Sequence, residues 1–171
     1  MFDPRFAGTL VPAATLLACM IAPATAAQAQ TATSTLTVSA TVTANCTVST
    51  SALAFGNVNT LSGSNVDSTG GLSVTCTNGT AWTAAAGVGA GSGASFASRR
   101  MTSGGNLLAY NLYTNSGRTT VWGNGTAGTA NLTGTGTGGA QSVTVYGRVG
   151  SGQTNVPAGA YVDTVTVTVT Y

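Results

Sequence analysis

Few side chains in this chain could carry out chemistry. The 171 residues include no histidine and three acids, and charged residues make up 5% of the chain, against about 25% in an average domain. Beyond residue 30 the acids are Asp67 and Asp163, far apart in the sequence. Acid–base or glycosidic chemistry needs two placed carboxylates or a histidine, and a hydroxyl nucleophile needs a base. The composition therefore predicts a protein that is not an enzyme and uses no cofactor.

The remaining charges predict structural roles. Arg99 and Arg100 form the only adjacent charged pair, which we interpret as a solvated turn. We expect Asp163 to make a structural hydrogen bond to a nearby turn. A net charge of +2 does not supply the basic patch or stripe that nucleic-acid binding needs, and nothing indicates a small-molecule substrate.

The cysteines predict a disulfide bond. Cys46 and Cys76 are the only cysteines after the N-terminal stretch, and an even pair in an exported chain most simply forms one bond. Closing a loop of about 30 residues would contribute roughly 3–4 kcal/mol, mainly by restricting the unfolded chain. A metal site is the alternative, but two thiols without histidine fill only half of a tetrahedral site.

The first 29 residues have the pattern of a secretory signal peptide. A basic start at Arg5 precedes a largely apolar stretch, and residues 27–29 (Ala-Gln-Ala) fit a small-x-small cleavage site. A membrane anchor is disfavoured because the apolar stretch is shorter than the roughly 20 residues of a span. Lipoprotein processing at Cys19, within Leu-Leu-Ala-Cys, remains an alternative.

Beyond residue 30 the apolar residues alternate with a period of two, which is typical of half-buried strands. Seven or so short strands separated by turn residues favour a sandwich or barrel. We read residues 132–139, rich in Gly and Thr, as a mobile loop. The expected strands cover residues 33–42, a strand carrying Cys46, 71–76, 82–88, 106–113, 119–122, 141–149 and 161–171.

The two ends of this region are complementary. The last strand alternates cleanly, and no further strand follows to cover its edge, which leaves backbone groups unpaired. The strand at residues 33–42 follows no turn and has no evident place in its own sheet. Strand donation between copies would satisfy both segments.

The sequence resembles the spore coat protein U family, which supplies major subunits of archaic-type (Csu-like) chaperone–usher pili. The order and spacing of several motifs carry the resemblance, none of them decisive alone. They are residues 45–48 (NCTV), 53–56 (LAFG), 74–82 (VTCTNGTAW), 100–101 (RM), 108–113 (LAYNLY), Arg118 with 122–123 (WG), 143–149 (VTVYGRV) and 157–171.

The resemblance implies an incomplete immunoglobulin-like β-sandwich that lacks its last strand and is completed by donor-strand complementation. Residues 1–29 would be the signal peptide, 30–43 the donor strand and 44–171 the sandwich domain. The donor side chains would be Leu36, Val38, Ala40 and Val42. The acceptor groove would be edged by the first core strand near Cys46 and by the C-terminal strand, with Val165, Val167, Val169 and Tyr171.

The resemblance also implies partners and a location. A periplasmic chaperone would lend a strand during folding, and an outer-membrane usher would exchange it for the donor strand of the next copy, giving a surface homopolymer. The leading hypothesis is a pilus subunit for surface adhesion and biofilm formation. A spore or cell-surface coat protein is the alternative. A tip adhesin is a third hypothesis, but it would be expected to carry an additional binding domain.

Overall fold

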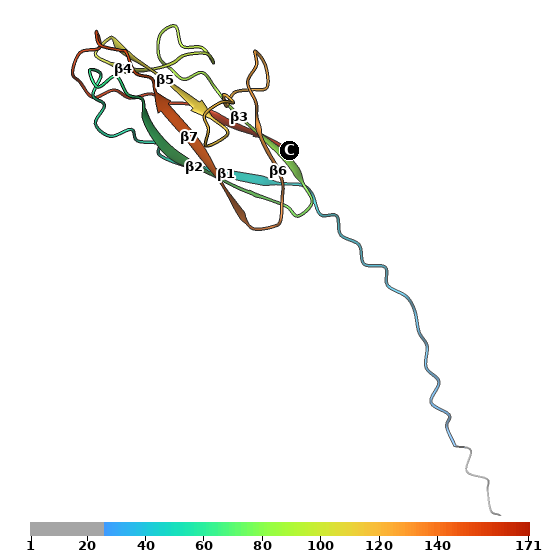
Figure 1. The fold of residues 1–171 in the computed structure, drawn as a ribbon. Coiled ribbons are helices and arrows are strands. Elements are labelled where there is room, and N and C mark those ends of the chain that lie inside the picture. The colour runs from blue at the N-terminus through green and yellow to red at the C-terminus, as the bar shows by residue number, and fades with distance from the viewer. Residues whose placement is uncertain (1–25) are drawn as a thin grey trace, which may run out of the picture. The chain divides into compact units, whose positions relative to one another are not determined.

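The computed structural model describes residues 26–171, and this part of the chain contains strands and no helix (Figure 1). It therefore contains no helix that could cross a membrane. The predicted signal peptide falls mostly outside the described residues, and Cys19 falls entirely outside them. The strands are β1 (Cys46–Ser51), β2 (Val66–Cys76), β3 (Ala81–Ala86), β4 (Arg99–Ser103), β5 (Asn106–Tyr113), β6 (Leu132–Thr135), β7 (Ala140–Val149) and β8 (Val167–Thr170).

The strands form two antiparallel sheets. One sheet has the order β1-β2-β7-β5-β4, and the other has the order β6-β3-β8. The longest ladder joins β2 to β7, from Val66 opposite Val149 to Thr75 opposite Ala140. Strands β1 and β8 each lie at the edge of a sheet, so each has one ladder partner.

The core lies between the inner faces of the two sheets. Alternate residues of β2, β3, β5 and β7 are buried, as the period-two pattern predicts. The buried apolar side chains are Leu72, Val74, Cys76, Trp82, Ala84, Ala86, Leu108, Tyr110, Leu112, Trp122, Val145 and Val149. The predicted strands at residues 71–76, 82–88, 106–113 and 141–149 are therefore present, within one or two residues for all but β2.

Three of the sequence predictions are wrong in part. Residues 132–135 form β6, not a loop. Gly134 lies opposite Trp82 in this ladder, and a Cβ there would collide with the indole ring, so glycine allows close packing. Residues 119–122 contribute isolated bridges through Val121 and Trp122 instead of a strand. The C-terminal ladder is limited to β8. Residues 33–42 have no regular secondary structure in this single chain, and the strand that they are expected to form with another copy stays a prediction.

The reading of Arg99 and Arg100 as a solvated turn is also wrong. Both residues begin β4, and Arg99 is fully buried. The Arg99 guanidinium donates hydrogen bonds to the Gly87 carbonyl (2.8 and 3.0 Å), the Trp122 carbonyl (2.6 Å) and Asn111 Oδ1 (2.7 Å). None of the described acids forms an ion pair with it, and burial lowers its pKa.

Arg99 thus joins three segments of the chain by binding two backbone carbonyl groups and one side-chain amide. Gly87 follows β3, Asn111 belongs to β5, and Trp122 lies in the connection between β5 and β6. The Phe96 ring lies 5.6 Å from the guanidinium carbon, a cation–π distance. A buried charge is tolerated only when its hydrogen bonds are satisfied, which explains why so many acceptors converge here.

We predict that Arg99→Met lowers the free energy of unfolding by about 2–5 kcal/mol, because it leaves buried carbonyl groups without donors. Urea denaturation followed by tryptophan fluorescence measures the change. Arg100→Met is the matched control: its guanidinium donates only to the Ser92 carbonyl at the surface, so its effect should stay below about 1 kcal/mol. Equal effects of the two substitutions would contradict the role assigned to Arg99.

Candidate functional site

An open groove of about 1090 Å³ is lined by residues of both sheets and of the segments beside them. One wall is formed by residues 50–61, which comprise the end of β1 and the chain after it. The opposite wall is formed by residues 156–165 and Val167 of β8. The floor is apolar and comes from the core side chains Met101, Leu108, Tyr110, Leu112, Trp122 and Val145.

The wall at residues 50–61 was missed in the sequence analysis. Leu53 and Phe55 are partly buried and pack against the core. A Cβ at Gly147 would meet both side chains at less than 3.0 Å, so this glycine lets the wall approach β7 closely. The Phe55 ring also makes an edge-to-face contact with Tyr110, 6.1 Å between centroids. Leu53 and Phe55 alternate with each other but are one residue out of phase with Cys46 and Val48 of β1, and this separate alternation is the signal that could have identified them.

Both rims of the groove retain apolar and backbone groups exposed to solvent. Leu61 and Val162 line the groove and are 78% and 69% exposed. The ladder of β8 pairs with β3 along one side only. A free strand edge beside a groove with exposed apolar rims is the arrangement that an added strand covers.

Asp163 fixes the wall of the groove at the beginning of the last segment. Its Oδ1 accepts hydrogen bonds from the backbone N–H groups of Ala90 and Thr164, both at 2.8 Å, and its Oδ2 accepts one from the Tyr110 hydroxyl at 2.7 Å. Burial and this hydrogen bond raise the pKa of Tyr110 well above its ordinary value, so the phenol remains a donor. The expected structural hydrogen bond from Asp163 to a nearby turn is present.

The turn that receives Asp163 requires glycine. Gly89 has a φ of +93°, and a Cβ at this position would collide with the Asp163 carboxylate. Positive φ is costly for residues other than glycine, so the backbone conformation and the nearby carboxylate both require glycine at this position.

Two of the four predicted acceptor residues line the groove and two lie outside its lining. Val165 and Val167 line the groove, whereas Val169 packs against the core outside it. Tyr171 is half exposed, and its hydroxyl lies 3.5 Å from Asn45 Oδ1. Cys46, near the other predicted edge, does not line this groove, whereas residues 50–61, from the end of β1 onward, do.

The four predicted donor residues are exposed. Leu36, Val38 and Val42 are 87%, 84% and 83% exposed, and Ala40 is exposed as well. Residues 30–45 include no charged residue. This segment therefore presents an uncharged row of alternating apolar and hydroxyl side chains that no residue from 26 to 171 covers.

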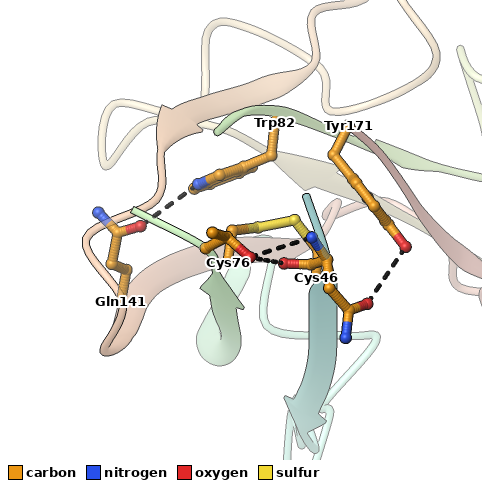
Figure 2. The surroundings of a disulfide bond; sticks show 7 residues. Cys46, Cys76, Trp82, Gln141 and Tyr171 are labelled. Carbon is orange, nitrogen blue, oxygen red and sulfur yellow. Dashed lines mark hydrogen bonds between the residues drawn. A yellow bond between two sulfur atoms is a disulfide. The ribbon is translucent and has the colours of Figure 1, made fainter. Parts of the chain in front are cut away.

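The predicted disulfide bond between Cys46 and Cys76 is present (Figure 2). The two cysteines are directly opposite each other in the ladder between β1 and β2. Nearby, the Trp82 indole N–H donates to Gln141 Oε1 at 3.3 Å. Among the described residues no group of three or more potential metal ligands occurs.

A second charged cluster lies on the outer surface, away from the groove lining. The Asp67 carboxylate accepts two hydrogen bonds from the Arg148 guanidinium, at 2.7 and 2.8 Å, and its Oδ2 lies 3.2 Å from Arg118 Nη1. The hydrogen bonds from Arg148 hold the pKa of Asp67 below its ordinary value. This pair joins neighbouring residues of β2 and β7.

This lowered pKa predicts a pH dependence of stability. Because Asp67 is more acidic in the folded chain, its contribution is complete above its unfolded pKa of about 3.9 and disappears as the pH falls through the lower folded value. Asp67→Asn should therefore destabilise the chain near neutral pH by about 1 kcal/mol or less, since the pair is partly exposed. Urea titrations at neutral pH and at successively lower pH measure the difference, which should shrink as the pH falls below the unfolded pKa. A difference that stays constant with falling pH would contradict the assignment.

The comparisons with known proteins agree with this geometry. The model of the Spore Coat Protein U domain family matches residues 32–168, and the chain belongs to this family. A comparison with curated protein sequences gave no match.

Among solved structures, the fold is similar to one in the crystal structure of the CsuC–CsuE chaperone–tip adhesion subunit pre-assembly complex from archaic chaperone–usher Csu pili of Acinetobacter baumannii. The TM-score is 0.55 and the sequence identity is 24%, over 77% of this chain and 40% of that chain. This chain thus spans less than half of the length of the chain that it matches. The likeness confirms the predicted fold class, an all-β immunoglobulin-like sandwich.

Proposed function

We propose that the chain is a structural pilus subunit that polymerises by donor-strand exchange. Residues 30–43 act as the donor strand, and residues 44–171 act as the acceptor domain. Leu36, Val38, Ala40 and Val42 of one copy enter the groove of the next. The observation that carries this proposal is the open apolar groove beside the free edge of β8.

The dimensions and chemistry of the two segments support strand donation. Ten extended residues span about 33 Å. A strand of this length can lie against the two stretches of chain that line the groove, residues 50–61 and 156–165. Each large apolar donor side chain that becomes buried contributes about 1.5–3 kcal/mol. The donor carries no charge, so its insertion buries none, and its backbone can pair with the edge of β8.

The same reasoning supports an assisted assembly pathway. Before complementation, the apolar rim residues Leu61 and Val162 and the edge of β8 are exposed, and such surfaces promote aggregation. A periplasmic chaperone that lends a strand would protect them, and an outer-membrane usher would exchange that strand for the donor of the next copy. Membership of the Spore Coat Protein U family and the likeness to a chaperone-bound subunit support this pathway.

The proposal places the signal peptide at residues 1–29 and the assembled polymer at the cell surface, in surface adhesion and biofilm formation. The family's description favours a second candidate, a coat protein that uses the same strand exchange. Electron microscopy of cells that produce the chain distinguishes them, because a pilus gives filaments and a coat gives a continuous layer.

Val38→Asp tests the donor assignment. Aspartate in the groove would bury an unpaired charge, which is strongly unfavourable, so we expect polymers to be lost while chaperone-bound monomer remains. Gel electrophoresis in SDS with and without boiling measures this, since donor-strand polymers give a ladder that collapses to monomer on heating.

Thr37→Asp is the matched control, because adjacent strand residues point to opposite faces. It adds the same charge one residue away and should leave the ladder intact. Normal polymers from Val38→Asp would contradict the proposed function, and so would an equal loss of polymers in both variants.

A further inference from the structure

The attachment of the donor segment to the folded domain has a mechanical consequence that depends on the proposed function. In a polymer of this kind, each domain is linked to its neighbour through its own N-terminal segment, which is covalently continuous with its own domain and held non-covalently in the neighbour's groove. Tension along the polymer therefore reaches the domain at residues 43–46. The bonds at this point decide which part of the fold yields first.

Asn45 is held by hydrogen bonds alone. Its backbone N–H donates to Thr77 Oγ1 at 3.1 Å, and its carbonyl accepts from the Thr77 N–H at 2.9 Å. Its side-chain oxygen lies 3.5 Å from the Tyr171 hydroxyl, at the end of the chain segment that contains β8. Such contacts give way one at a time when the chain is pulled outward.

The next residue carries the covalent bond. Cys46 opposite Cys76 is the first pair of the β1–β2 ladder, which ends at Ser51 opposite Gly71 (Figure 2). Strand β1 is at the sheet edge, so without a cross-link a pull at Cys46 would open the ladder pair by pair. With the disulfide, the load passes to β2, which is paired on both sides by β1 and β7.

Opening of β1 would also damage the groove. Thr50 and Ser51, the last residues of β1, belong to the wall that faces the segment containing β8. A subunit pulled at its N-terminal end would therefore lose the wall that retains the donor strand of its other neighbour. The state of one joint in the polymer would then depend on the load at the next joint.

We propose that the Cys46–Cys76 disulfide is a mechanical clamp that prevents tension on the N-terminal segment from peeling β1 away and releasing the strand held in the groove. This role is distinct from general stabilisation of the fold. A clamp matters only when the force arrives through the N-terminal segment, whereas general stabilisation matters for every direction of pull.

Single-molecule pulling on the mature chain with a synthetic peptide of residues 33–42 in its groove separates these roles. In the first geometry, one handle is on the peptide and the other is on the chain's own N-terminus. In the second geometry, the chain's handle is instead at the exposed turn Gly104–Gly105 between β4 and β5. Each geometry is applied to the native chain and to the Cys46→Ala/Cys76→Ala variant.

The clamp predicts that loss of the disulfide lowers the rupture force in the first geometry and leaves it unchanged in the second. The six residues of β1 should also extend the variant by about 20 Å before the peptide is released. Equal rupture forces in the first geometry would overturn the clamp. An equal reduction in both geometries, which includes the case of a poorly folded variant, would overturn it as well.

The zero-force measurement distinguishes failure of the clamp from failure of the proposed function. Binding of the fluorescent peptide to the native chain is measured before any load is applied. Binding followed by unchanged rupture forces overturns the clamp alone. Absence of peptide binding to the native chain overturns strand donation, and the clamp with it.

Discussion

The rest of the structure depends on one deficit: the sandwich leaves one apolar-lined groove unfilled. Burial of apolar side chains is the main favourable contribution to folding, so the exposed apolar side chains Leu61 and Val162 at the groove would be stabilised by a strand that fills it. The free edge of β8 also has backbone N–H and carbonyl groups that can still form hydrogen bonds. One uncharged strand with alternating apolar side chains can fill the groove and bind these backbone groups, and residues 33–42 of the same sequence have this pattern.

An open groove can select a strand only if its walls keep their positions while it is empty. Two polar networks serve this purpose. Asp163 ties the last segment to the Ala90 backbone and to Tyr110 in the floor. Arg99 ties the end of β3 to β5 and to the Trp122 carbonyl. The chain has only five basic residues, and one of them, Arg99, is fully buried. Its charge therefore holds the segments around it in place.

The sequence predicted the parts of the fold that depend on local pattern. Strict alternation predicted β5 and β7, because their inner faces pack against a core that any such strand would share. Arg99 could not be found in this way, since its acceptors are carbonyl groups that only the tertiary fold brings together. β6 was missed because Gly and Thr usually indicate loops, and Gly134 is required by the Trp82 ring from another strand.

The candidate site was predictable in part for the same reason. Val165 and Val167 follow the alternation of the last segment, and they line the groove. The opposite wall was missed because Leu53 and Phe55 lie outside regular strands and gain their positions from Gly147 and Tyr110. Residues 33–42 have a strand pattern but no regular strand in the isolated chain, which is expected of a strand whose partners lie in another copy.

Hydrogen exchange of the mature chain with an added peptide of residues 33–42 tests the central claim most directly. The account predicts slower exchange at residues 50–61 and at residues 156–167, which contain the two walls, and little change in the ladder between β2 and β7, two inner strands of their sheet. A peptide of the same composition with its alternation broken should give no slowing. Unchanged exchange at both walls, or equal slowing by the two peptides, would contradict an acceptor groove for this strand.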